Sequence, residues 1–315
     1  MIYFVKRIKL SNQTVNFITI IKVYGLMQGL SYMSKFGGYL RLMRPLNCLM
    51  MGFAVIVGAA VASPSLFSKL WQSLIYGFIT GFMLTAASMA INDYYDRRID
   101  AINEPKRPIP SGLIKPREAL TFALALTAMG FVAAYLTSTF CFAIAVIAWI
   151  IFVIYTTVGK RSGLLGNFLV STCVSIPLIY GTYTVAGTLE RNVLVFAAMV
   201  FLSNTGREVT KGIVDVQGDK MQSIETLAVR YGEKTAAVIA ASFYFSAILL
   251  SPIPWLLGLV SFWFIPLVTI TDIGLATSSF ALLKGYSKGN ARKVKNSVLL
   301  WSIFGLLAFI LGVLW

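Results

Sequence analysis

Residues 71–100 read WQSLIYGFITGFMLTAASMAINDYYDRRID, an apolar run that passes directly into a cluster of carboxylates. The stretch from about 70 to 91 holds no charged residue and reaches the roughly 20 residues that a helix needs to cross a bilayer. If the helix continues further, Asn92, Asp96 and Asp100 fall four residues apart on one face, with Asp93 beside them. The pattern predicts a membrane helix that ends in a row of oxygen-bearing side chains.

The composition indicates that most of the chain, and not only this stretch, is apolar enough to lie in a membrane. Of its 315 residues, 57% are hydrophobic and only 12% are charged, whereas soluble domains carry about 25% charged residues. An ordinary soluble enzyme is therefore excluded. The apolar runs predict an all-α, polytopic membrane protein with nine transmembrane helices, at about residues 45–63, 70–91, 119–137, 139–156, 164–187, 191–206, 235–257, 259–283 and 296–315.

The basic residues indicate how the bundle is oriented. When successive loops alternate sides, all but two of the 27 Lys and Arg residues fall on the N-terminal side, the exceptions being Lys69 and Arg191. Because cytoplasmic loops are enriched in Lys and Arg, we expect a cytoplasmic N-terminus and a C-terminus outside the cell. Topology thus accounts for the net charge of +15, and no nucleic-acid partner is expected.

The acidic residues gather in two loops on that same cytoplasmic side. These clusters follow the second and sixth predicted spans, four spans apart, which indicates two four-helix repeats with a ninth helix appended. Sites in membrane proteins built from repeats tend to lie where the repeats meet. The first cluster comprises Asp93, Asp96, Asp100, Glu104 and Glu118, and the second Glu208, Asp215, Asp219, Glu225 and Glu233.

The residue types in these clusters favour a magnesium and phosphate site. Asp215 and Asp219 repeat the four-residue spacing, and two facing carboxylate rows repel each other unless a cation lies between them. Oxygen ligands without His or Cys suit Mg²⁺, which proteins often hold together with substrate phosphates. Basic side chains nearby are expected to meet phosphate oxygens: Arg97, Arg107, Lys160 and Lys211.

The chain contains no histidine, which excludes His-based acid–base catalysis, Ser-His-Asp triads and the usual His-containing zinc sites. Its three cysteines, Cys48, Cys141 and Cys173, stand alone in apolar stretches. We interpret them as small core residues.

Four motifs together resemble the UbiA superfamily of intramembrane prenyltransferases, over about residues 38–315. They are NDxxDxxxD at 92–100, RPIPSG at 107–112, the segment Tyr155–Lys160, and DxxxD at 215–219. The resemblance implies nine helices around a central cavity and Mg²⁺-dependent transfer of a prenyl chain from an isoprenyl diphosphate to a lipophilic acceptor.

The resemblance also implies roles for individual residues. Asn92, Asp96 and Asp100, with Asp93 beside them, would bind one Mg²⁺, and Asp215 and Asp219 a second. Arg107, Lys160 and Lys211, with Arg97 nearby, would bind the diphosphate. Tyr155 would face the allylic carbon and, with Asp96 and Asp219, forms the expected catalytic set.

Residues 43–47 and 207–219 resemble most the branch of the family that makes archaeal ether lipids. That branch transfers a geranylgeranyl group from geranylgeranyl diphosphate to geranylgeranylglyceryl phosphate, giving digeranylgeranylglyceryl phosphate. Arg44 and Arg161 are candidates for the acceptor phosphate. One departure is Gly212, where the branch leads us to expect an acidic residue.

Two other functions remain open at this point. Prenylation of an aromatic quinone or haem precursor, such as 4-hydroxybenzoate, would keep the family but change the acceptor. A secondary transporter is disfavoured because transporters place their sites near the bilayer midplane, and Asp272 is the one carboxylate within a predicted span. Asp272 either hydrogen-bonds a neighbouring Thr or Tyr or lies at the cavity floor.

Residues 1–32 are only patchily apolar and lie outside the resemblance. We expect a basic N-terminal extension, either a segment at the membrane interface or sequence that precedes a true start at Met27 or Met33. Residues 33–315 are expected to form a single membrane domain in contact with lipids.

Overall fold

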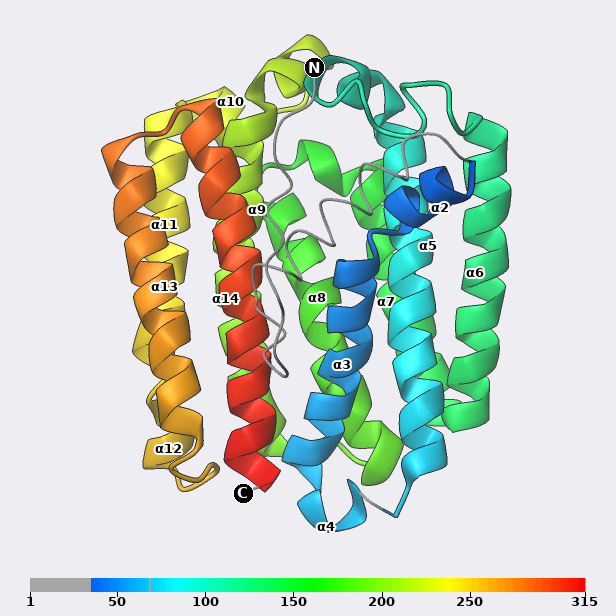
Figure 1. The fold of residues 1–315 in the computed structure, drawn as a ribbon, viewed down its shortest axis with the longest axis vertical. Coiled ribbons are helices and arrows are strands. Elements are labelled where there is room, and N and C mark those ends of the chain that lie inside the picture. Colours follow the sequence, from blue (N-terminus) through cyan, green and yellow to red (C-terminus); the bar gives the residue numbers. More distant parts are fainter. Residues whose placement is uncertain (1–34, 68, 315) are drawn as a thin grey trace, which may run out of the picture.

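The computed structural model describes residues 35–67 and 69–314, and the predicted extension 1–32 lies outside them. All regular secondary structure in the described residues is helical (Figure 1). The prediction of an all-α protein is thereby confirmed, whereas the division into an extension and one membrane domain stays a prediction.

Nine of the described helices have 18 or more residues and run side by side along the long axis of the molecule (Figure 1). They are α3 (Pro45–Ala62), α5 (Trp71–Asn103), α6 (Pro116–Thr137), α7 (Thr139–Thr157), α8 (Leu164–Val185), α9 (Arg191–Met221), α11 (Glu233–Leu250), α13 (Phe264–Lys284) and α14 (Lys288–Leu314). Short helices lie toward the two ends: α2 (Lys35–Met43) and α10 (Leu227–Tyr231) at one, α4 (Pro64–Phe67) and α12 (Ile253–Leu256) at the other.

Eight helices in the described part of the chain are long and apolar enough to cross a membrane, one of these stretches running from α11 into α12. The long helix outside this group is α9, because its apolar stretch ends near Leu202 and is followed by Asn204, Arg207 and Glu208. The structure therefore supports a polytopic membrane protein, and the count of nine spans and the repeat layout stay predictions.

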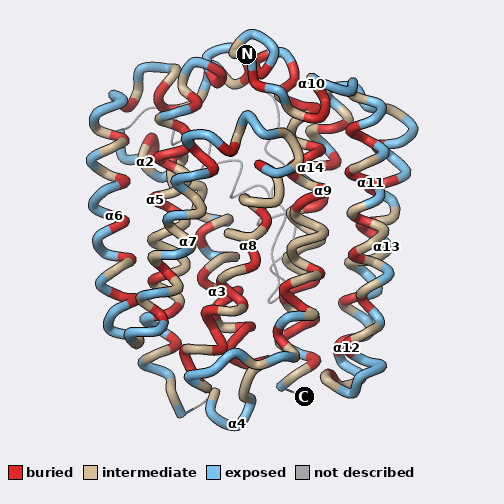
Figure 2. The backbone as a smooth tube through the Cα atoms, turned by 180° about the vertical axis from the view of Figure 1, so that it is seen from behind, coloured by how far each residue is buried: buried red, intermediate tan, exposed pale blue. Residues whose placement is uncertain are grey.

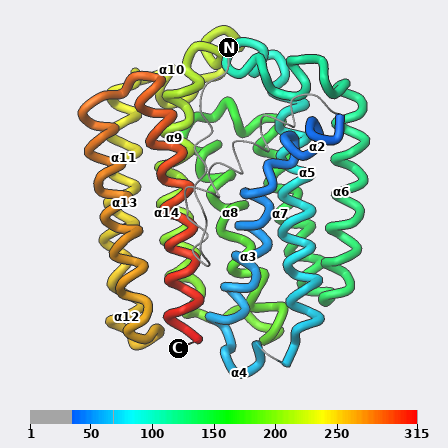
Figure 3. Tube along the Cα trace, in the orientation of Figure 1, coloured from blue at the N-terminus to red at the C-terminus, as the bar shows by residue number. Residues whose placement is uncertain are grey.

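The long helices form a closed ring. Each one packs against the next in chain order, from α3 to α14, and α14 returns to contact α3. Figure 3 shows this path, with the first and last helices of the ring, α3 and α14, lying near each other. Helices that are not consecutive in the ring also make contact, namely α3 with α8 and α9 with α14. A site at the centre of this ring is walled by helices that are far apart in sequence.

Glycines allow α3 and α8 to approach very closely. A Cβ atom on Gly181 of α8 would collide with the backbone carbonyl of Val55, and one on Gly58 of α3 with the carbonyl of Leu178. Small residues at helix contacts are typical of membrane bundles, where van der Waals packing drives association. This contact holds α3 and α8 together on one side of the central cavity.

The outer surface of the ring is apolar. Large hydrophobic side chains such as Leu124, Tyr135 and Leu249 are exposed there, as expected of helices that face lipid. Buried residues concentrate on the inward faces of the helices (Figure 2).

We expect Gly181→Ala to lower the stability of the folded protein by about 1–3 kcal/mol, because the added methyl group overpacks a backbone contact. Thermal unfolding in detergent measures the change. Gly289→Ala is the matched control, since a Cβ atom there meets nothing within 4 Å. Equal unfolding midpoints for the two variants would contradict the close approach of α3 and α8.

Candidate functional site

The first carboxylate row lies on a continuous helix, as predicted. Helix α5 continues past its apolar part to Asn103, so Asn92, Asp96 and Asp100 share one face. All three side chains are buried. The second row lies on α9, which extends to Met221 and carries Asp215 and Asp219.

The two rows meet at one end of the bundle, around a small polar pocket of about 50 Å³. The side chains expected to bind metal and diphosphate line it together: Asn92, Asp96, Asp100, Asp215, Asp219, Arg107, Lys160 and Lys211. Tyr155 and Arg44 line it as well. The structure thus brings most of the predicted site residues to one place. Gly212, which stands where an acidic residue was expected, lines the same pocket.

A close contact between α5 and α9 holds the rows together. Asn103 Nδ2 donates to the carbonyl of Asp215 at 3.2 Å, and Asn103 Oδ1 accepts from the backbone N–H of Gly218 at 3.3 Å. A Cβ atom on Gly218 would collide with the Asn103 amide and lie 3.0 Å from Ile99 Cγ2. Glycine between Asp215 and Asp219 therefore sets the distance between the helices. Asn103 is a residue that sequence reasoning missed.

Basic side chains offset the repulsion between the carboxylates. Lys160 Nζ, carried by the short 3-10 helix η2 (Gly159–Arg161), contacts Asp96 Oδ1. Arg107 Nη1 lies 2.6 Å from Asp100 Oδ2 and 3.3 Å from Asp93 Oδ1. Since these carboxylates are buried, leaving them unpaired would carry a large desolvation penalty.

The loop that carries Arg107 is anchored to the bundle. Ile109 and Ile114 are buried in a cluster with Leu42 of α2. The backbone N–H of Ser111 donates to the carbonyl of Arg107 at 3.0 Å. These contacts explain how a polar loop can hold a guanidinium group at a defined position.

Arg44 and Asp93 form a second ion pair beside the pocket. Arg44 Nη2 lies 2.6 Å from Asp93 Oδ1. The Arg44 backbone has a φ of 53°, a left-handed conformation that is uncommon for residues other than glycine and often found at functional sites. Asp93 is engaged by Arg44 and Arg107 and does not line the pocket.

The structure does not bring Arg97 and Arg161 into the site. The Arg97 guanidinium lies 4.7 Å from the centre of the Tyr94 ring and donates to the Tyr94 carbonyl at 2.7 Å. Arg161 is exposed. Neither lines the polar pocket or the larger cavity beside it.

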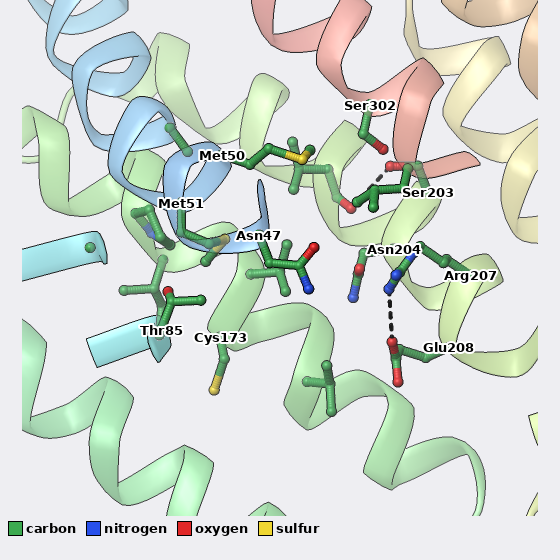
Figure 4. A pocket seen from close by; sticks show the side chains of 18 of the residues that line it. Asn47, Met50, Met51, Thr85, Cys173, Ser203, Asn204, Arg207, Glu208 and Ser302 are labelled. Carbon is green, nitrogen blue, oxygen red and sulfur yellow. Dashed lines mark hydrogen bonds and ion pairs between the residues drawn. The ribbon is translucent and has the colours of Figure 1, made fainter. Parts of the chain in front are cut away.

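That larger cavity, of about 320 Å³, occupies the centre of the ring. Its walls come from α3, α5, α7, α8, α9, α11, α13 and α14 and are mostly apolar. Figure 4 shows Asn47, Asn204 and Arg207 reaching into this space. Tyr155, which is buried, lines both the cavity and the polar pocket. The two spaces therefore adjoin, the polar one leading into the apolar one.

Two acidic side chains in the cavity wall have defined partners. Glu208 accepts from Arg207 and from Lys211, each at 3.2 Å. Asp272 lines the cavity and accepts a hydrogen bond of 2.5 Å from Ser251. Of the two roles expected for Asp272, a place in the cavity wall agrees with the structure, while its hydrogen-bond partner is Ser251 and not Thr or Tyr.

The donor set of the polar pocket fits a hard divalent cation. In the described residues no three Asp, Glu, Cys or His side chains converge into a metal site, and Lys160 and Arg107 lie against Asp96 and Asp100. Asn92 Oδ1 is buried and has no hydrogen-bond partner, although buried polar atoms are nearly always paired. Oxygen donors from two helices, one of them orphaned, suit Mg²⁺ with further ligands from phosphate.

Comparisons with known proteins identify relatives of the chain. The family model described as UbiA prenyltransferase family matches residues 51–312. Digeranylgeranylglyceryl phosphate synthase of Methanosarcina barkeri is 35% identical over 286 residues, which cover 87% of this chain and 98% of that protein.

Solved structures share the fold. One, described as digeranylgeranylglyceryl phosphate synthase in membranes, is similar with a TM-score of 0.67 and 31% identity and covers 89% of this chain and 99% of its own. A UbiA homologue from Archaeoglobus fulgidus bound to GPP and Mg²⁺ is similar with a TM-score of 0.62 and 17% identity, covering 87% and 99% of the two chains.

We expect Gly218→Ala to destabilise the protein by about 1–3 kcal/mol, because the methyl group forces α5 and α9 apart at the Asn103 amide. Gly212→Ala is the control, six residues earlier on α9, where the nearest atom to an added Cβ is 3.7 Å away. Thermal unfolding of both purified variants measures the difference. The contact would be refuted as a determinant of the site if both variants unfolded at the same temperature.

Proposed function

The chain belongs to the UbiA prenyltransferase family and is a prenyltransferase, and we propose that it transfers a geranylgeranyl group from geranylgeranyl diphosphate to geranylgeranylglyceryl phosphate. The product would be digeranylgeranylglyceryl phosphate, a precursor of archaeal ether lipids. The relatives' names motivate the choice of substrates. One observation carries the proposal: a polar pocket with two carboxylate rows and basic side chains leads, past Tyr155, into an apolar cavity.

Asn92, Asp96 and Asp100 on α5 and Asp215 and Asp219 on α9 are the proposed Mg²⁺ ligands. When bound, Mg²⁺ would neutralise the diphosphate and stabilise the negative charge that develops as it leaves. Asp93 has a different role in this proposal, because its carboxylate orients Arg44 and Arg107.

Arg107, Lys160 and Lys211 are the proposed diphosphate ligands. Breaking the allylic C–O bond leaves both electrons on the diphosphate, and fixed cations in a site poor in water stabilise that charge strongly. Arg107 and Lys160 already lie against carboxylates, so they are held in place before the substrate arrives. This arrangement limits the reorganisation needed during the reaction.

The apolar cavity would hold the prenyl chain and protect the carbon that becomes electron-poor. Tyr155, Trp149 and Phe152 line it near the polar pocket, and aromatic faces attract positive charge. Exclusion of water prevents hydrolysis of this carbon. The acceptor hydroxyl oxygen would then form the new C–O bond to this carbon, and its proton would pass to the released diphosphate.

The chain is a multi-pass membrane protein. In our proposal the end that carries α2, α10 and the polar pocket faces the cytoplasm, because the basic loops lie there, and α14 ends on the outside. The acceptor and the prenyl chain are both lipophilic, so lipids of the surrounding membrane are expected partners.

A transfer assay tests the substrates. We expect detergent-purified protein with geranylgeranyl diphosphate and Mg²⁺ to alkylate geranylgeranylglyceryl phosphate, and a chelator to abolish the reaction. 4-Hydroxybenzoate, offered in parallel, separates the acceptor classes. Alkylation of 4-hydroxybenzoate alone would indicate an enzyme of quinone synthesis. Transfer to neither acceptor would refute the proposal.

We expect Asp96→Asn and Asp219→Asn each to lower turnover by at least about 100-fold, which corresponds to about 2.7 kcal/mol of transition-state stabilisation. Both should also lose the shift in unfolding temperature that Mg²⁺ gives the wild type, since a bound ion stabilises the state that binds it. Glu225→Gln, on an exposed acidic residue, is the control and should behave as wild type. Near-normal turnover in either Asp variant would refute the assigned metal ligands.

A further inference from the structure

A second group of cations lines the central cavity on α9 and α14. Arg207 and Lys295 line the large cavity but not the polar pocket. Arg207 lies on α9, one turn before Lys211, and Lys295 lies on α14, which packs against α9. The diphosphate site proposed above uses neither of them.

Lys295 belongs to the face of α14 that lines the cavity. It is followed on that face by Leu299, Ser302 and Leu306, at the spacing expected of one side of a helix. Its neighbours on α14 differ from it. Arg292 Nη2 lies 2.5 Å from Glu104 Oε1, and Lys293 is exposed.

Lys295 makes no hydrogen bond or ion pair with the described residues around it. It lines the cavity together with other cations, among them Arg44, Arg207 and Lys211, and Asp215 is the charged neighbour with the largest effect on it, an attraction. A lysine held among like charges in a largely apolar cavity is unfavourable unless an anion joins it.

Arg207 is also incompletely paired. Its Nη1 donates to Glu208, which Lys211 shares, while its Nε is buried and has no hydrogen-bond partner. Glu208 is thus one carboxylate between two cations, and Lys295 adds a third positive charge. If Asp215 is engaged by a metal ion, this side of the cavity retains an excess of positive charge and an unsatisfied guanidinium donor.

We infer that Arg207 and Lys295 form a second anion site, which binds the phosphate of the acceptor lipid. The inference rests on the proposed function and specifies how the acceptor is recognised. In an acceptor of this kind the free hydroxyl is on the glycerol carbon next to the one that bears the phosphate, so the phosphate must bind close to the reacting atoms but apart from the diphosphate. Lys211 and Glu208, which line both spaces, separate the two anion sites.

Arg44 and Arg161 were the candidates expected from the sequence to bind the acceptor phosphate, and this assignment gives that role to neither of them. Arg161 is exposed and lines neither space. Arg44 lines both spaces but is engaged by Asp93. The apolar wall that continues along α14 from Leu299 to Phe309 offers room for the ether-linked chain of the same acceptor.

Kinetics with two acceptors test the site. Geranylgeranylglyceryl phosphate and the same lipid without phosphate, geranylgeranylglycerol, are offered to the full-length protein with saturating geranylgeranyl diphosphate and Mg²⁺. We expect Lys295→Ala to raise KM for the phosphorylated acceptor about 10- to 100-fold, the loss expected for one hydrogen bond to a charged group. KM for the donor and the reaction with geranylgeranylglycerol should not change.

Two further variants serve as controls. Lys295→Arg should restore most of the preference for the phosphorylated acceptor, and Lys293→Ala, on the exposed face of α14, should behave as wild type. A rise in KM for the donor in Lys295→Ala, or equal losses with both acceptors, would overturn the inference.

Binding without turnover separates this inference from the proposed function. The affinity of geranylgeranylglyceryl phosphate is measured in the presence of a chelator and without donor, for wild type and Lys295→Ala. Weaker binding to the variant supports the site even if the wild type transfers nothing and the proposed function fails. Equal affinities, or no binding to the wild type, overturn it.

Discussion

Mutual repulsion between buried carboxylates is the constraint on which the rest of the structure depends. Helices α5 and α9 carry two acidic rows that would separate if left alone, yet Gly218 and Asn103 bring the helix backbones together beside them. The charge is offset by Arg107 and Lys160, which come from a loop and a 3-10 turn outside the two helices. The loops at this end of the ring are therefore part of the site, because they supply the cations that make the helix contact possible.

The local features of this arrangement could be predicted from the sequence. Apolar runs located the apolar part of each long helix, but not the polar extensions by which α5 reaches Asn103 and α9 reaches Met221. The four-residue spacing placed Asn92, Asp96 and Asp100 on one face because that property belongs to a single helix. Which helix faces which cavity depends on tertiary packing. The sequence does not show this packing, and the expectation that Arg97 meets phosphate therefore failed: Arg97 lies against Tyr94 of its own helix. Lys295 and Asn103 gave no local signal, because the residues that they meet across the bundle are more than 70 positions away in sequence.

The polar half of α9 is acceptable only because other helices surround it. This helix contacts α5, α8, α11 and α14, and its Asn204, Arg207 and Glu208 face the cavity and not lipid. Polar groups within a membrane protein are costly unless they face the interior and find partners. The same residues that lower the hydropathy of α9 line the cavity, so the long helix with the weakest span signal is the one that carries polar side chains into the interior of the bundle.

The closure of the ring by α14 has a consequence for biogenesis. Protein chains emerge from the ribosome N-terminus first, so α3 to α13 leave it before the helix that completes the wall and contributes Lys295. Until α14 inserts, the cavity is open to the bilayer on one side, and Arg207 and Lys211 of α9 lack the helix that packs beside them in the folded protein. The nascent enzyme therefore acquires an enclosed reaction space, and with it the capacity to keep a reactive prenyl group from water, only at the last step of its membrane insertion.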